Sequence, residues 1–322
     1  MAETLQGFRR ALRQQGRIDM SAISIRKVQS ARSRSHAARN VSTMGVVVAL
    51  FLIAYYALVF IVPFYRAIWL SFQNWDFIVD PIYVGMRNYD HVIHDDYFWQ
   101  AAKVTLVFSV AEISIALICA FGVALGIHQL PHVLQRFYLG LFYIPVVVPG
   151  IVSILLWRWL YLPGDGVING VLSRFGLPVQ PFLNSTSQAL WCIIAMVVWA
   201  NLGGAAIIFF AGINEISIDL LEAAKLDGAG LWRQTINIII PLLRPIFFYQ
   251  VVVSVIGTVQ MFEQFYLLSG PGFSTRTLAV YTYELGFKTL NLGYGATVSI
   301  FIFLFLLAAT VIQVQRFMTK QS

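Results

Sequence analysis

The segment that decides the fold reads Glu222-Ala223-Ala224-Lys225-Leu226-Asp227-Gly228, and Ile238-Ile239-Ile240-Pro241 follows ten residues later. It lies between two long apolar stretches, residues 189–213 and 246–268. Apolar and acidic side chains alternate along it, a pattern too polar for a bilayer interior and too regular for an unstructured loop. We therefore expect a folded, solvent-facing connection between two membrane spans.

Start and stop signals divide this connection into two short helices. Asp219 is a candidate N-cap, with Glu222 three residues later, and Gly228 is a candidate left-handed C-cap, so the first helix should cover residues 219–226. A second helical run from Leu231 should end at Pro241. Two helices joined by a glycine hinge form a rigid knob, which can transmit force between two proteins.

Composition places the rest of the chain in a membrane. The 322 residues are 58% hydrophobic and 11% charged, whereas soluble domains contain about 25% charged residues. A span needs about 20 apolar residues. Six candidates are residues 44–64, 104–125, 137–160, 189–213, 246–268 and 295–314. The predicted fold class is an all-α integral membrane protein with six transmembrane helices and a coupling helix in the cytoplasm.

Charge predicts how the chain is oriented. Residues 1–43 hold nine basic and two acidic side chains, an excess of +7 that equals the net charge of the whole chain. Because basic segments stay in the cytoplasm, both termini and the connection 214–244 should be cytoplasmic. The predicted parts are a cytoplasmic tail (1–43), a six-helix transmembrane domain (44–316) with an exterior loop (71–102), and a second cytoplasmic tail (317–322).

The exterior loop carries a possible metal motif, His91, His94, Asp95 and Asp96. Two histidines on an interfacial helix are common, and no third group of ligands supports a closed site, so we expect no metal. The loop should contain a turn followed by an aromatic-rich helix at the membrane interface, facing an extracytoplasmic partner. Cys119 and Cys192 are interpreted as packing residues of two spans.

The spacing EAA-x3-G-x9-I-x-[L/I]-P resembles the cytoplasmic loop signature of ABC importer permeases. The resemblance extends over residues 45–317. Within this family, the chain is similar to the carbohydrate branch and to permeases of the maltose-permease F or glycerol-phosphate permease A type. Further matching stretches are residues 83–89, 98–99, 157–160, 166–169, 199–203, 211–213, 270–271 and 274–275. The chain departs from the family pattern at Ser269 and Ser217.

The resemblance implies the partners of this chain in a bacterial cytoplasmic (inner) membrane. These are a second permease subunit of similar fold, two ABC ATPase subunits, an extracytoplasmic solute-binding protein and a carbohydrate substrate, with no nucleic acid. No Gly-Lys pair occurs, so the chain has no phosphate-binding loop of the Walker A type. We expect no catalytic residues and no cofactor here, because ATP and Mg²⁺ would bind to the partner ATPases.

The resemblance assigns residues to two sites. The ATPase-coupling residues are Glu222, Ala223, Ala224, Asp227, Gly228 and Pro241. The substrate pathway is carried over to Trp199, Leu202, Gly203, Phe262, Glu263 and Tyr266, and the polar character of the fifth span adds Gln260. The competing interpretation of the pathway residues is packing against the partner permease. Glu112 is interpreted as a helix–helix hydrogen-bonding residue.

Other functions remain open at this point. An ion-coupled secondary carrier should pair ionisable groups inside the bilayer, and Glu112 and Glu263 are its candidates. A membrane scaffold would not require the polar and aromatic side chains at residues 260–266. An ABC permease for a non-sugar solute such as glycerol phosphate is a further alternative. The sequence does not name the sugar or its chain length.

Overall fold

The computed structural model describes residues 43–319. The predictions for the basic tail and the end of the chain therefore fall mostly outside the described residues. Within the described range the chain is helical, apart from one short hairpin and its connecting turns. It divides into two compact units, residues 1–65 and 66–322, which are described separately.

One long helical span belongs mostly to the first unit. Helix α3 (Thr43–Tyr56) continues through the π-helical segment η1 (Ala57–Ile61) into α4 (Val62–Ser71). The most apolar 18-residue window within Met44–Ser71 has a mean hydropathy of 2.7, and the side chains of this span in the first unit are almost all exposed. The π segment ends two residues before Pro63, whose ring disfavours the regular hydrogen bond to the preceding turn.

Among the described residues, four helices could each cross a bilayer, and the predicted count of six is reached if each of two bent helix pairs forms one span. Helices long and apolar enough to cross a bilayer are Met44–Ser71, α6 (Asp96–His128), α10 (Ala189–Asn214) and α17 (Leu292–Thr319). The two bent pairs that pass the same test together are α7 (His132–Val147) with α8 (Gly150–Leu160), and residues Leu231–Leu242 with α14 (Arg244–Val259).

The third span is bent where we expected a continuous helix over residues 137–160. Helices α7 and α8 meet at 92°. Val148 adopts an extended conformation (φ −69°, ψ 125°), as the steric bulk of the following Pro149 favours. The proline therefore ends α7 and allows α8 to start in a new direction.

The fifth span was also predicted as continuous, and this prediction was wrong. Helix α14 ends at Val259, and a separate short helix, α15, covers Glu263–Leu267. The Thr258 hydroxyl donates to the carbonyl of Ser254 at 2.8 Å, a bond that bends helices. The fifth-span residues assigned to the substrate pathway therefore lie on a break and on α15 rather than along one helix face.

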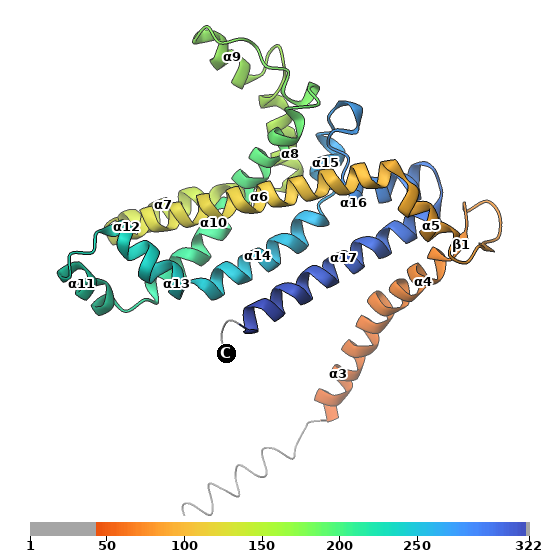
Figure 1. Ribbon diagram of the computed structural model, residues 1–322, viewed down its shortest axis with the longest axis horizontal. Coiled ribbons are helices and arrows are strands. Elements are labelled where there is room, and N and C mark those ends of the chain that lie inside the picture. The colour runs from red at the N-terminus through yellow and green to blue at the C-terminus, as the bar shows by residue number, and fades with distance from the viewer. Residues whose placement is uncertain (1–42, 320–322) are drawn as a thin grey trace, which may run out of the picture. The chain divides into compact units, whose positions relative to one another are not determined.

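Helices α6 and α10 form the centre of the second unit, with α7 and α14 against them and α17 beside α14 (Figure 1). Small side chains on α6, Ala116, Ala120 and Ala124, are fully or nearly buried and allow the helices to approach closely. Buried Glu112 of α6 forms a side-chain hydrogen bond with Asn201 of α10. This interaction supports the helix–helix role of Glu112, which stays a prediction.

Short elements connect the long helices. They are β1 (Gln73–Asn74), β2 (Ile82–Tyr83), α5 (Arg87–His94), α9 (Val167–Arg174), η2 (Phe182–Asn184), η4 (Pro271–Phe273), α16 (Leu278–Tyr283) and η5 (Glu284–Lys288). Strands β1 and β2 pair antiparallel. Helix α6 begins at Asp96, so Tyr97, Phe98 and Trp99 form its first turn instead of an interfacial helix in the loop.

Asp95 ties the start of α6 to the C-terminal part of the chain. Its carboxylate caps α6 by accepting from the N–H of Tyr97 at 2.9 Å. It also accepts from the hydroxyls of Tyr281 and Tyr294, the latter at 2.6 Å. Burial disfavours the charged form, but these hydrogen bonds outweigh it, so the pKa of Asp95 lies below its ordinary value. His91 stacks on the ring of Tyr294 at 4.6 Å.

Candidate functional site

The connection between α10 and α14 contains the first of the two expected helices, α11 (Ile218–Leu226). Its N-cap is Ser217 rather than Asp219, and no side chain among the described residues caps it. Asp219 lies in the first turn instead, where its negative charge is favourable to the helix dipole. The predicted position of the helix is confirmed to within one residue, whereas the predicted N-cap was wrong.

The C-terminus of α11 is closed as the sequence predicted. Gly228 has a φ of +78°, the left-handed conformation that glycine adopts without steric cost. The N–H of Gly228 donates to the carbonyl of Lys225 at 3.0 Å, and the N–H of Ala229 donates to the carbonyl of Ala224 at 2.9 Å. This pair of hydrogen bonds is the Schellman motif, which fixes the direction of the chain after the helix.

One face of the connection is anchored in the protein. Leu221 is buried in a core cluster with Ile239 and Leu243, on the far side of the hinge. Gln234, which is also buried, donates from its side chain to the carbonyl of Ala229 at 2.6 Å. These contacts hold α11 and the following helical run, residues 231–242, as one body.

The other face is open to solvent and apolar at its tip. Leu226 is 89% exposed and Trp232 is 77% exposed, on either side of the glycine hinge. Among the predicted coupling residues, Glu222, Ala223, Asp227 and Gly228 are exposed, while Ala224 and Pro241 are half-buried. Leu226 and Trp232 were not among the predicted site residues, although apolar side chains in a polar connection are the signal that could have identified them.

Two of the substrate-pathway residues, Phe262 at the N-cap of α15 and Tyr266 within it, lie in an aromatic group. The rings of Phe262 and Tyr266 stack at 5.2 Å, and each contacts Tyr283 of α16, at 4.9 and 5.2 Å. Tyr266 is 37% exposed, and Phe262 and Tyr283 are half-buried. Tyr283 was missed by the sequence analysis, because nothing in the linear sequence shows that it contacts α15.

The predicted residues of α10 contact other helices. Trp199 forms an edge-to-face contact with Trp157 of α8 at 5.7 Å. Trp157 and Phe262 both pack against the core cluster that contains Phe265, so the two predicted groups border one core. Leu202 is half-buried and packs against another cluster, with Phe209.

Gly203 is a packing position in this conformation. A Cβ there would overlap the backbone carbonyl of Phe142 in α7. Because the residue is buried between two helices, glycine is required for their close approach. The assignment of Gly203 to a substrate pathway stays a prediction.

The polar pathway residues lie at helix ends. Gln260 follows the end of α14 and borders a pocket of about 430 Å³ together with Thr282 and Ser299. Glu263 is exposed, and its Oε2 lies 3.9 Å from the position of a Cβ on Gly150, the first residue of α8. A carboxylate near the start of a helix is stabilised by the helix dipole.

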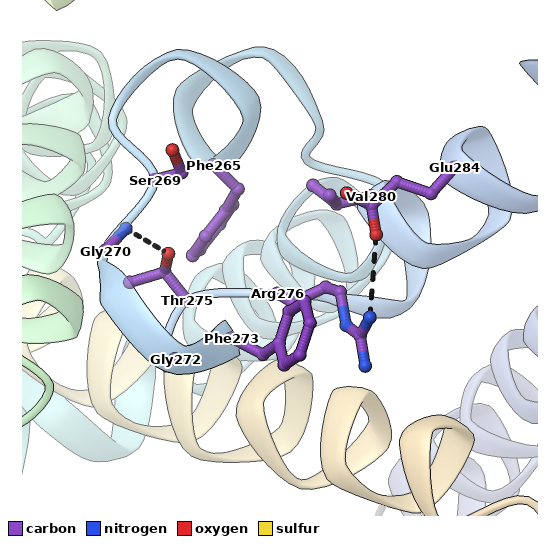
Figure 2. Close-up of a pocket in the computed structure, with 9 residues that line it drawn as sticks. All are labelled: Phe265, Ser269, Gly270, Gly272, Phe273, Thr275, Arg276, Val280 and Glu284. Carbon is purple, nitrogen blue, oxygen red and sulfur yellow. Dashed lines mark hydrogen bonds and ion pairs between the residues drawn. The ribbon is translucent and has the colours of Figure 1, made fainter. Parts of the chain in front are cut away.

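A second pocket, of about 270 Å³, lies beside α15 and α16, and Figure 2 shows the residues that line it. Arg276 pairs with Glu284 at 3.7 Å, and Glu284 pairs with Lys288 at 3.1 Å. The guanidinium lies over the rings of Phe273, Tyr97 and Tyr281, at 3.8, 4.9 and 5.0 Å. These charged residues were not predicted as part of a site.

Comparison with known proteins identifies the family. Residues 112–319 match the family described as the binding-protein-dependent transport system inner membrane component. The sn-glycerol-3-phosphate transport system permease protein UgpA of Yersinia pestis is 31% identical over 265 residues, which cover 80% of this chain and 88% of that protein. The probable ABC transporter permease protein YurN of Bacillus subtilis is 29% identical, with 82% and 94% covered.

Another relative is the probable starch degradation products transport system permease protein AmyD of Thermoanaerobacterium thermosulfurigenes, 27% identical with 80% of this chain and 88% of that protein covered. Two solved structures of bacterial alginate ABC transporters contain chains of the same fold. Their TM-scores are 0.75 and 0.77, at 20% and 21% identity, covering 87% and 88% of this chain and 94% and 98% of theirs.

The chain therefore belongs to the binding-protein-dependent family of ABC importer permeases. It is a multi-pass membrane protein and a transport permease, as the loop signature and the apolar spans predicted. The predicted family and fold class are confirmed.

Proposed function

We propose that this chain is one half of a heterodimeric pathway that moves a carbohydrate into the cell by alternating access. The observation that carries the proposal is the connection 214–244, a rigid body with an anchored face and an exposed apolar tip at Leu226 and Trp232. Such a body can dock on a partner and transmit its movement. A flexible loop would absorb the movement instead.

Two partner ATPase subunits would bind ATP and Mg²⁺ and supply the work. On this proposal Glu222 and Leu226 contact the ATPase, while Gly228 holds α11 at a fixed angle to the following helix. Closure of the ATPases would pull the docked connections together and change the direction in which the pathway opens. The chain itself would hydrolyse nothing.

The relatives and the side chains of the pathway indicate the cargo, and charge indicates the orientation. Relatives named for starch degradation products and for glycerol phosphate favour a carbohydrate or a related polyol phosphate. The aromatic and polar side chains at residues 260–266 suit the apolar faces and hydroxyls of a sugar. The basic tail favours cytoplasmic termini, so that connection 214–244 faces the ATPases and α9 faces a solute-binding protein.

ATP-driven uptake into liposomes tests this function. The permease pair, the ATPases and the binding protein are co-purified, reconstituted and supplied with labelled sugars or labelled glycerol phosphate. We expect uptake only with ATP and loaded binding protein. Uptake driven by a proton or sodium gradient without ATP would identify an ion-coupled carrier and would refute the proposal, whereas uptake of glycerol phosphate alone would correct its cargo.

A further inference from the structure

The aromatic group of α15 continues beyond the residues assigned to the substrate pathway. Tyr283 of α16 stacks on Phe287 of η5, with ring centroids 5.1 Å apart and ring planes 27° apart. Phe262, Tyr266, Tyr283 and Phe287, here called the aromatic cluster, thus form a continuous set of rings contributed by two segments of the chain. The exposed fraction of the residues rises along the cluster, from half-buried Phe262 to Phe287, which is 67% exposed.

Charged side chains border the exposed end of the aromatic cluster. The Lys288 ammonium lies 5.1 Å from the centroid of Tyr266 and donates to Oε1 of Glu284 at 3.1 Å. Glu284 also pairs with Arg276, which lines the 270 Å³ pocket of Figure 2. The cluster therefore combines aromatic faces with tyrosine hydroxyls, an ammonium group and a carboxylate within reach of the same surface.

This combination differs from a surface built for another membrane helix. Helix–helix contacts in a bilayer use small side chains and close backbone approach, whereas the aromatic cluster presents large rings with polar tips. Carbohydrates have apolar C–H faces edged by hydroxyls, and sites that bind them use aromatic faces with a few placed polar groups. The chemistry of the cluster matches a carbohydrate more closely than it matches lipid or an apolar helix.

We propose that Tyr283 and Phe287 are further carbohydrate-contact residues, which extend the pathway from Phe262 and Tyr266 toward the exposed end of the aromatic cluster. The ring centroids of Phe262 and Tyr283 are 4.9 Å apart, and those of Tyr283 and Phe287 are 5.1 Å apart. Because the rings follow one another in this way, they offer faces to more than one sugar ring. The substrate class is therefore an oligosaccharide rather than a monosaccharide. This inference rests on the proposed function.

The test compares Phe287→Ala with Phe305→Ala. Phe305 is a 49% exposed phenylalanine of α17 outside the aromatic cluster, so it controls for loss of an exposed ring. Both variants are reconstituted with the partner permease, ATPases and binding protein. A panel of radiolabelled saccharides is tested first, neutral and acidic, from monosaccharides to tetrasaccharides. The saccharides that the wild-type complex takes up then serve as the probes. The readouts are uptake rate at saturating loaded binding protein, yield of assembled complex and ATPase activity without saccharide.

We expect Phe287→Ala to lower oligosaccharide uptake about 2- to 10-fold, as loss of one aromatic contact does. Monosaccharide uptake, complex yield and ATPase activity without saccharide should stay unchanged, and Phe305→Ala should match wild type. The inference would be overturned if Phe287→Ala lowered the uptake of all probe lengths equally, or if the wild-type complex took up monosaccharides only. A lower yield of assembled complex for Phe287→Ala would also overturn it, because it would identify Phe287 as a subunit contact. If the wild-type complex takes up no probe, the proposed function itself fails.

Discussion

The N–H of Ala229 donates to the carbonyl of Ala224 at 2.9 Å, and this bond closes the end of α11 over Gly228. On the other side of the hinge, the Gln234 side chain donates to the carbonyl of Ala229. One backbone segment is therefore bonded to both helices of the connection. This double attachment is the physical reason that the connection is rigid at the glycine hinge.

Gly228→Ala should impair coupling, and Gly230→Ala should not. Both glycines have open space around the position of a Cβ among the described atoms, but Gly228 has a φ of +78° and Gly230 has a φ of −66°. A side chain in the left-handed conformation costs about 1–2 kcal/mol, so Gly228→Ala shifts α11 or the hinge. ATP-driven uptake by the two variants checks this, and equal activity would show that the hinge conformation does not matter.

Leucine-to-alanine changes on the two faces of α11 should separate folding from docking. Leu221 is 8% exposed in the core, so Leu221→Ala should lower stability by about 2–5 kcal/mol. Leu226 is 89% exposed, so Leu226→Ala should leave the melting temperature in detergent unchanged and weaken ATPase binding. The melting curve and the amount of ATPase retained on purification measure these effects. A stable Leu221→Ala variant would argue against the anchored face.

Protonation of the Asp95 carboxylate should lower the stability of the folded protein at acid pH. Its pKa is lowered in the folded protein because hydrogen bonds from Tyr281, Tyr294 and Tyr97 outweigh the effect of burial. A lowered pKa gives stability that is present above the unfolded pKa of about 3.9 and is lost as the pH falls through the folded value. The melting temperature should therefore be insensitive to Asp95 from neutral pH down to about 5 and decrease below about 4.

The control for that pH dependence is Asp95→Asn. Asparagine still caps a helix N-terminus but has no charge to lose, so the variant should be less stable at neutral pH and show a smaller acid-side decrease. Tyr294→Phe should remove one hydrogen bond to the carboxylate, worth about 1.5–3 kcal/mol. Identical melting curves for wild type and Asp95→Asn from neutral pH to about 3 would contradict this account.

Adjacent glycines in α10 should differ in their tolerance of a methyl group. A Cβ on Gly203 would overlap the carbonyl of Phe142, whereas the atom nearest to a Cβ on Gly204 is Cγ2 of Val146 at 4.0 Å. Gly203→Ala should therefore separate α7 from α10 and lower the yield of folded protein, and Gly204→Ala should behave as wild type. Size-exclusion profiles in detergent distinguish the two. A normal yield of Gly203→Ala would mean that α7 moves away easily.

Local chemistry allowed much of this fold to be predicted. Gly228 ended α11 where a left-handed C-cap was expected, and Pro241 and Pro245 mark the bend before α14. The six apolar stretches were found because burial in lipid needs length and apolar composition alone. The family signature placed Glu222 and Ala223 on exposed positions of α11, although their role stays a prediction.

Features that depend on long-range contacts were not predictable. The sequence shows Pro149, but the 92° bend depends on how α7 and α8 pack on other helices. Asp95 was considered as part of a metal motif, and its tyrosine partners are about two hundred residues away in the chain. Tyr283 and Phe287 joined the pathway residues only through the packing of α15 on α16.

Photo-cross-linking from Leu226 tests the central claim, docking of α11 on an ATPase, most directly. Leu226→Cys is introduced with Cys119→Ser, because Cys119 is exposed and Cys192 is buried, and the thiol is labelled with a benzophenone maleimide in the assembled complex. Val171→Cys on α9, a 48% exposed position expected on the opposite side of the membrane, is the control. The account predicts cross-linking of Leu226→Cys to the ATPase subunit and none from Val171→Cys. The account would be contradicted by a transport-competent complex in which Leu226→Cys forms no cross-link to the ATPase. It would also be contradicted if Val171→Cys formed a cross-link to the ATPase.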